Sequence, residues 1–392
     1  MKSFLFTLLV ISSSLYSLSL EEIITNALNK HPSLEVIKHR IEASKSITNI
    51  SNQFSNPRLV YTQNTLDDKQ AMSKKTITLT QKLPYFGKLD SLKNIALVDE
   101  QIQKVNLDIA KVELVKNIKQ QAYEIWKLEQ LYKIIDEYEK LTRQNIKLFE
   151  SYTSTTNNQH VGIMSAELTL SNLRIEKSKL NSQIISAYAK LSYLSSQKIK
   201  ELNLDLYITN LPSITKLQIG LENNNKLAVK NKEILKTKAL IKNAKLNNYP
   251  DINVIASYSQ RNNFDDFSTF GFGLSLPIYA TEDYKEEEKY ALALSKTSMK
   301  EDIKVEIDSN FEVAYAQMES AYEIYTIINK DALPKLEHMF GLMSSSVVSG
   351  EDLFKYIDIL IQMLKLEQKS ILAIALYHDS NANISALKGE IK

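Results

Sequence analysis

The chain has 392 residues, and its 48 Lys and Arg against 46 Asp and Glu give a formal net charge of +2. There is no long block of one sign, so the charge pattern argues against nucleic acid as a partner. Cysteine is absent, which excludes disulfides, thiolate metal sites, a catalytic thiol and a lipid-bearing cysteine. With 8 Gly and 7 Pro, the chain has few helix breakers, and long helices are expected.

The first residues have the pattern of a secretory signal peptide. A basic residue precedes an apolar run over residues 4–11, and small polar residues follow. A membrane-spanning helix needs roughly 20 apolar residues, so this run is too short to be an anchor. Ser17 and Ser19 supply small side chains before the expected cleavage site. We predict that residues 1–19 form the signal peptide, give or take two residues, and that the mature chain begins near Leu20.

The mature chain reads as two copies of one unit. Pro57 matches Pro250 at an offset of 250 − 57 = 193 residues, and Pro84 matches Pro277 at the same offset. Apolar positions upstream match at this spacing too. We therefore predict an internal two-fold repeat in which each copy contains a helix, a strand pair and a long helical hairpin. Its parts are a first repeat over residues 20–202, a linker over 203–213 and a second repeat over 214–392.

Each copy contains a segment in which the hydrophobic period drops to two, which is typical of strands. We expect two strands near residues 58–64 and 76–80, and two near 251–259 and 270–276, with polar loops over 65–74 and 261–267. In the last strand large apolar residues alternate with glycine or serine. We expect one set to face lipid, namely Phe270, Phe272, Leu274 and Leu276, and the other to face inward, namely Gly271, Gly273 and Ser275.

A helix of about 60 residues, roughly 90 Å long, is expected after each strand pair. Apolar residues step by three and four along both helices, as in a coiled-coil seam. The seams are Ile95, Val98, Ile102, Val105, Ile109 and Val112 in the first copy, and Phe311, Ala314, Met318, Ala321, Tyr325 and Ile328 in the second.

We place the hairpin tips at turns containing Gly162 and Gly350. The second return helix has two seams side by side, which predicts a neighbouring helix on each side. Such a helix suits a wall of helices rather than a compact bundle.

Four strands of about ten residues can span an outer membrane, but open strand edges cannot face lipid. The chain must therefore oligomerise. Three copies would supply twelve strands, and the same threefold axis would close the long helices into a tube. The predicted fold class is mainly α with a small β part, in which helical hairpins form an α-barrel and four strands contribute to a trimeric β-barrel.

At this point the sequence resembles the TolC-type outer-membrane efflux proteins over nearly the whole mature chain. The matching features are Leu20-Glu21-Glu22 before a helix ending at His31-Pro32, the strand exit over residues 81–88, and Pro334 sixteen residues before Gly350. The resemblance implies a homotrimer in outer-membrane lipid with a large periplasmic part. It also implies docking through a periplasmic adaptor protein onto an inner-membrane efflux transporter or a type I secretion transporter.

The resemblance further implies an acidic constriction just after the second hairpin glycine. Glu351 and Asp352 follow Gly350 directly, Asp358 lies two turns on, and Glu167 is the matching acid in the first hairpin. The usual acid pair is not reproduced, since Tyr356 and Ile359 occupy the places where it is expected. Acids in the first turn of a helix are also stabilised by its dipole, so simple helix capping stays open as the alternative.

No converging set of nucleophile, base or metal ligands is found in either copy, so we predict no enzyme activity, no catalytic residues, no cofactor and no metal site. His338, Met339 and Met343 could bind a soft metal ion, but methionine at helical spacing is usually core filler. The leading prediction is a passive export duct. An exported trimeric coiled-coil adhesin or envelope scaffold is the alternative, although such a protein needs no amphipathic strand pairs.

Overall fold

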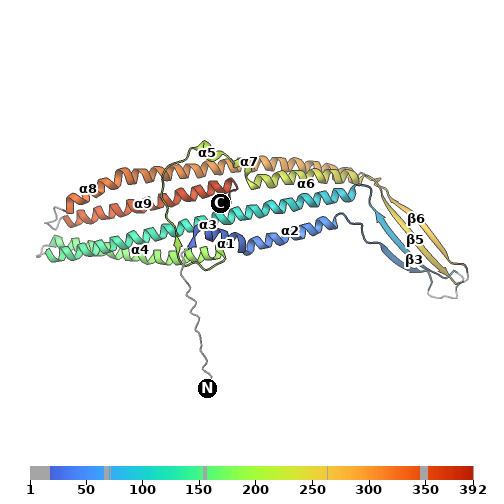
Figure 1. Cartoon of the computed structure of the whole chain (residues 1–392), viewed down its shortest axis with the longest axis horizontal. Helices are drawn as coiled ribbons and strands as arrows, with labels where there is room; N and C mark the ends of the chain where they lie inside the picture. The colour runs from blue at the N-terminus through green and yellow to red at the C-terminus, as the bar shows by residue number, and fades with distance from the viewer. Residues whose placement is uncertain are drawn as a thin grey trace, which may run out of the picture.

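The computed structural model describes residues 18–65, 70, 72–152, 157–262, 264–344 and 352–391. The described chain is elongated. A sheet lies at one end, and long helices run from it to the opposite end (Figure 1). A linker without regular structure crosses the helices near the middle of the molecule.

The first half begins with a capped helix. Strand β1 (Leu18–Ser19) pairs in parallel with β4 (Leu202–Asn203), and helix α1 (Leu20–Lys30) follows directly. Ser19 and Glu22 form the capping box, in which the Glu22 N–H donates to Ser19 Oγ over 3.3 Å and the Ser19 N–H donates to Glu22 Oε2 over 2.9 Å. The remaining elements are α2 (Pro32–Ile50), β2 (Arg58–Gln63), β3 (Lys74–Leu83), α3 (Lys88–Tyr152) and α4 (Asn157–Ser195).

The second half contains a similar order of elements. They are α5 (Ile214–Gln218), a 3₁₀ turn η1 (Leu221–Asn223), α6 (Asn225–Asn247), β5 (Asp251–Arg261), β6 (Phe267–Ser275), α7 (Thr281–Ile327), a π-helical turn η2 (Ile328–Ala332), α8 (Leu333–Ser344) and α9 (Asp352–Leu387). The predicted long helices are confirmed. Helix α3 has 65 residues, and α7, η2 and α8 continue from one to the next.

The π-helical turn η2 comes just before Pro334, which has no N–H to donate. Within η2, the side-chain amide of Asn329 donates to the carbonyl of Tyr325 over 2.9 Å and to Ser370 Oγ in α9 over 2.8 Å. A side chain therefore satisfies a backbone carbonyl at the widened turn and ties this turn to the neighbouring helix.

The helices form a layer with α3 at its centre (Figure 1). Helix α3 packs against α2, α4, α6 and α9, α7 packs against α6 and α9, and α4 also contacts α9. Both predicted seams are buried or half-buried along their length. Val98 and Ile102 pack with Val229 of α6, and Phe311 and Met318 pack in a core cluster between α7 and α9. No helix in the described ranges is long and apolar enough to cross a membrane.

The turn predicted at Gly162 is wrong. Helix α3 ends at Tyr152 and α4 begins at Asn157, so Gly162 lies inside α4, where it is buried. A glycine inside a helix costs only about 1 kcal/mol relative to alanine, and tertiary packing can offset this cost. The other predicted tip residue, Gly350, lies outside the described residues.

Candidate functional site

The four long strands form one antiparallel sheet in the order β2-β3-β5-β6, so the strand pairs of the two halves meet through β3 and β5. The register is continuous across the sheet. Leu59 pairs with Leu79, Leu79 with Ala256, and Ala256 with Phe270. Side chains alternate between faces along each strand, so such rows assign every strand residue to one face or the other.

The two faces differ sharply in composition. The apolar face carries large hydrophobic side chains on all four strands: Leu59, Tyr61, Ile77, Leu79, Ile252, Val254, Ala256, Tyr258, Phe270, Phe272 and Leu274. The polar face carries mostly hydroxyl, amide, glycine and basic residues: Arg58, Thr62, Thr76, Thr78, Thr80, Lys82, Asn253, Ser257, Ser259, Gly271 and Gly273. The four-strand prediction is confirmed, and the sheet is amphipathic as a whole.

The residues predicted to face lipid are among the most exposed apolar side chains of the described chain. The exposed fraction is 79% for Phe270, 80% for Phe272 and 58% for Leu274, while Leu276, at 61%, lies just past the end of β6. Gly271 and Gly273 lie on the polar face and are partly covered. The first three residues therefore share one exposed face, and nothing else in the described chain covers it.

Sheet and helix layer both end in open edges. Among the described strands, β2 and β6 are the outer ones, and each lacks a partner on one side. In the helix layer the outer elements are α2 and α4 on one side and α7 on the other. Exposed apolar side chains lie on both of these outer groups: Ile47, Ile175 and Ile185 on α2 and α4, and Leu294, Val305 and Ile327 on α7. The chain thus has two lateral edges that it cannot cover itself.

A charged contact that sequence reasoning missed fixes the sheet to the helices. Lys88 Nζ at the start of α3 lies 2.6 Å from Asp251 Oδ1 and donates to the carbonyl of Tyr249 over 2.8 Å. Lys82 Nζ lies 3.0 Å from Asp251 Oδ2, and the Tyr85 N–H donates to Oδ1 over 3.0 Å. These groups lie more than 160 residues apart in sequence, so local spacing carries no signal for their contact.

The predicted gate residues are described only in part. Glu351 lies outside the described residues, and Asp352 is the first residue of α9. Asp358 is exposed and accepts a hydrogen bond from Gln362 Nε2 over 2.6 Å, and Glu167 is exposed on α4. Tyr356 and Ile359, which occupy the places expected for acids, are buried in the helix core. Asp358 and Glu167 therefore lie outside the buried core, and no described contact joins one to the other.

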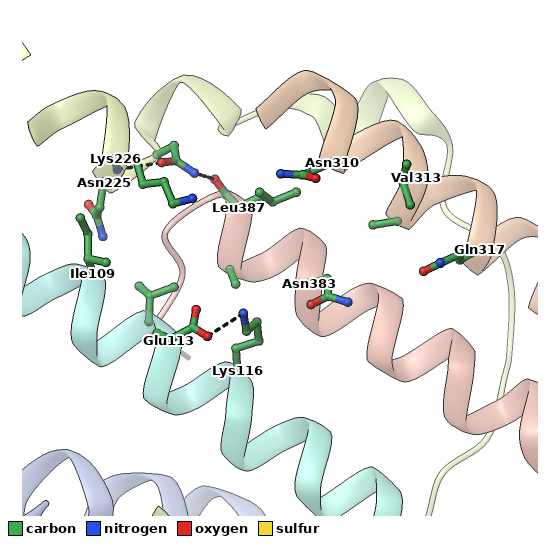
Figure 2. A pocket seen from close by; sticks show the side chains of 14 residues that line it. Ile109, Glu113, Lys116, Asn225, Lys226, Asn310, Val313, Gln317, Asn383 and Leu387 are labelled. Atoms are coloured by element: carbon green, nitrogen blue, oxygen red, sulfur yellow. Dashed lines mark hydrogen bonds and ion pairs between the residues drawn. The ribbon is translucent and has the colours of Figure 1, made fainter. Parts of the chain in front are cut away.

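A cavity of about 370 Å³ lies where the end of α9 meets the start of α6, between α3 and α7 (Figure 2). Asn224 joins the two helix ends, because its Nδ2 donates to the carbonyl of Leu387 over 2.7 Å and its Oδ1 accepts from the Lys226 N–H over 2.8 Å. Lys116 pairs with Glu113 over 2.8 Å. The lining charges have partners within the chain, so this cavity is a gap between helix ends rather than a prepared ligand site.

Buried titratable groups in α9 hold the linker. Tyr377 donates from its hydroxyl to the carbonyl of Asn210 over 2.7 Å, and His378 Nε2 lies 3.2 Å from the carbonyl of Tyr207. Burial lowers the pKa of His378. Burial also raises the pKa of the neighbouring Asp379 to about 6, and Glu124 adds to this effect. No described group of three or more His, Asp or Glu side chains is arranged to hold a metal ion.

Comparisons with known proteins identify the fold. The sequence matches no protein-family profile and no curated protein. The structure matches the open state of the Neisseria gonorrhoeae outer membrane channel MtrE with a TM-score of 0.80 and 16% identity, over 95% of this chain and 89% of that one.

Two further solved structures agree with this match. The outer membrane protein VceC of Vibrio cholerae has a TM-score of 0.77 and 13% identity, covering 95% of this chain and 97% of that one. CusC, studied for its folding and transmembrane channel formation, has a TM-score of 0.79 and 13% identity, covering 95% and 92%. This chain therefore has the fold of outer-membrane channel proteins, as the resemblance to TolC-type proteins implied.

Proposed function

We propose that this chain is one protomer of a homotrimeric outer-membrane export duct. The observation that carries the proposal is the amphipathic sheet, whose apolar face is exposed on all four strands and whose two edges are unpaired. In water such a face and such edges are unfavourable. In a membrane the face is favourable, provided that the edges are closed.

Closure by identical copies follows from the position of the edges. Strand β2 lies on the side of the chain formed by α2 and α4, and β6 lies on the side formed by α7. In such an assembly, the β2 side of one copy contacts the β6 side of the next copy, which is a heterologous interface. Repeating a heterologous interface gives a closed ring when the rotation between neighbouring copies divides a full turn evenly. Three copies give twelve strands, which is within the range of single barrels in outer membranes. The same ring would pack the exposed apolar side chains of α7 against those of α2 and α4.

The placement in the envelope follows from the same sheet. Strands β3, β5 and β6 have 10, 11 and 9 residues, which is the length of a tilted membrane-spanning strand. The edge strand β2 has 6 residues and is shorter than the predicted ten. The helices then lie in the periplasm, and the loops at the far end of the sheet lie outside the cell. The resemblance to TolC-type proteins implies the remaining partners, a periplasmic adaptor protein and an inner-membrane transporter of an efflux or type I secretion system. The duct itself would be passive and not an enzyme.

An exported adhesin or envelope scaffold is the competing function. Long paired helices would serve it equally well, but an exposed apolar face over four strands would be a liability on a surface protein in water. The sheet therefore favours the duct.

The test is to extract outer membranes of cells that express the protein with detergent and purify it. We expect a trimer that resists dissociation by heat and forms channels of uniform conductance in planar bilayers. A protein that stays in the soluble fraction, or that assembles without conducting, would contradict the proposal.

A further inference from the structure

The polar face of the sheet carries more positive than negative charge. The strand register places Arg58, Lys74, Lys82 and Arg261 on this face, and Asp251 is the one acid among the strand residues that share it. The net charge of these side chains is 4 − 1 = +3 per chain. The remaining positions are uncharged. By contrast, the apolar face carries one charged residue, Lys75, at the loop end of β3.

The one acid does not neutralise Lys82. Asp251 is also paired with Lys88, which is buried, so two lysines share a single carboxylate. The side chain of Lys82 remains 51% exposed. Arg58 is exposed as well, and it pairs across the sheet with Thr80, two residues before Lys82 on the same face. Arg58 and Lys82 together form what we name the cationic band, at the helix-side end of the sheet.

The other two cations of the polar face, Lys74 and Arg261, contact the Phe267 ring. The Arg261 guanidinium lies 4.9 Å from the centre of the Phe267 ring and donates to the carbonyl of Asp265 over 2.6 Å. Lys74 Nζ lies 5.0 Å from the centre of the same ring. Asp266 Oδ1 accepts a hydrogen bond from the Arg261 N–H over 3.0 Å. The Phe267 ring and the loop backbone therefore hold these two half-buried cations at the outer end of the sheet, and the exposed cations of the polar face are those of the cationic band.

We infer that the cationic band makes the strand part of the duct favour anionic solutes, those carrying carboxylate, phosphate or sulfate groups, over cations. The inference rests on the proposed function, in which three copies place three cationic bands around one lumen. A narrow passage with low-dielectric walls focuses the field of such charges and raises the local concentration of counter-ions. Screening limits the effect to roughly 10 Å at 0.1 M salt and roughly 3 Å at 1 M, so the preference must weaken as salt rises.

The experiment measures the ratio of chloride to potassium permeability of the purified protein in planar bilayers under a potassium chloride gradient. We compare wild type with the double variant Arg58→Gln/Lys82→Gln and with Lys75→Gln, which removes one cation from the opposite face of the same sheet. We expect the double variant to lower the ratio at least about twofold at 0.1 M salt, and by less at 1 M. Lys75→Gln should leave it unchanged. Lys74→Gln, at the other end of the polar face, should lower the ratio by a smaller amount and provides a second test if the double variant fails to assemble.

The outcomes separate the inference from the proposed function. If the wild-type protein forms no channels, the proposed function fails. If it conducts but the ratio is the same in wild type and in the assembled polar-face variant, the inference is overturned while the duct stands. An equal change in Lys75→Gln would also overturn it, because the effect would then not depend on the face of the sheet.

Discussion

Phe272 and Gly273 are neighbours in β6 but lie on opposite faces of the sheet. Phe272 is 80% exposed on the apolar face, whereas a Cβ added at Gly273 would lie 3.6 Å from Asn253 Cβ, an ordinary contact. We predict that Phe272→Arg lowers the amount of heat-resistant oligomer in outer membranes, because a lipid-facing arginine near mid-membrane costs roughly 2 to 4 kcal/mol. Gly273→Arg should assemble and reduce conductance instead. Equal loss of assembly in both variants would show that the facing assignment is wrong.

The contacts of Leu18 and Ser19 bear on where the predicted signal peptide is cut. A mature chain beginning at Leu20 would lack both the Ser19 cap of α1 and the pairing of Leu18 with Leu202. Loss of a serine cap alone costs about 1 kcal/mol. We therefore predict cleavage after Ser17, at the early end of the predicted window, and a mature chain that begins with Leu18. Mass spectrometry of the N-terminal peptide checks this, and a peptide beginning at Leu20 would contradict it.

At the scale of single elements, a charge network joins α3 to α4. Lys177 Nζ lies 2.5 Å from Asp136 Oδ1 and 2.9 Å from Glu139 Oε2, and Glu139 is buried. We predict that Lys177→Gln destabilises the protein by about 1 kcal/mol, since Arg143 and Arg174 still reach Glu139. Lys179→Gln, an exposed lysine two residues on, is the matched control. Thermal unfolding should show a lower unfolding temperature for Lys177→Gln than for Lys179→Gln. Equal unfolding temperatures of the two variants would mean that the contacts of Lys177 add no stability.

The same network predicts a pH dependence. Hydrogen bonds from Lys140 and Lys177 lower the pKa of Asp136 from 3.8 to about 2. Because the pKa is lower in the folded state, this contribution to stability is complete above the unfolded pKa and is lost as the pH falls through the folded one. The difference in unfolding temperature between wild type and Lys177→Gln should thus be constant from neutral pH to about pH 5 and shrink below about pH 4. A difference that persists at pH 2 would point to lost packing rather than lost charge.

The strands and long helices could be predicted because their signals are local. Each signal reports which face of a single element is apolar. The strand shows it as period-two alternation in Phe270-Gly271-Phe272-Gly273, and the helix shows it as the three-four spacing of Phe311, Ala314 and Met318. The turn near Gly162 could not be predicted from glycine alone. The residues between the end of α3 at Tyr152 and the start of α4 at Asn157 are serine and threonine, a composition typical of helix caps and turns.

At the scale of the whole molecule, local sequence patterns do not predict which helices and strands contact one another. The sequence predicts that α9 has a neighbouring helix on each side, but not that α3 packs against α2, α4, α6 and α9, nor that α9 also contacts α4. The pairing of β3 with β5 and the contact of Lys88 with Asp251 likewise join the two halves of the chain. Such contacts depend on how elements meet in space, and they determine which edges are left for another copy.

In the proposed duct, an acidic gate at the periplasmic end is expected from the positions of two acids in the sequence. Glu351 and Asp352 follow the second hairpin glycine, and threefold symmetry would bring three copies of each toward one axis. Like charges held close to an axis attract cations. Helix α9 begins, at Asp352, at the end of the described chain opposite the sheet (Figure 1). In the proposed duct the closed gate would therefore favour cations, whereas the strand part would favour anions.

Replacing Glu351 and Asp352 by Gln and Asn keeps the size of both side chains and removes 2 × 3 = 6 charges from a trimer. Because charges at a constriction add to the selectivity of the whole passage, we expect the double variant to be less cation-selective and less blocked by divalent cations than wild type, with little loss of trimer stability. The matched control is Glu301→Gln/Asp302→Asn, which removes two exposed consecutive acids from α7. Planar-bilayer recordings of selectivity and of block by magnesium check the prediction. If the Glu351 and Asp352 double variant matches wild type in both, these two acids are not the gate, and Asp358→Asn then tests the remaining predicted gate acid of α9.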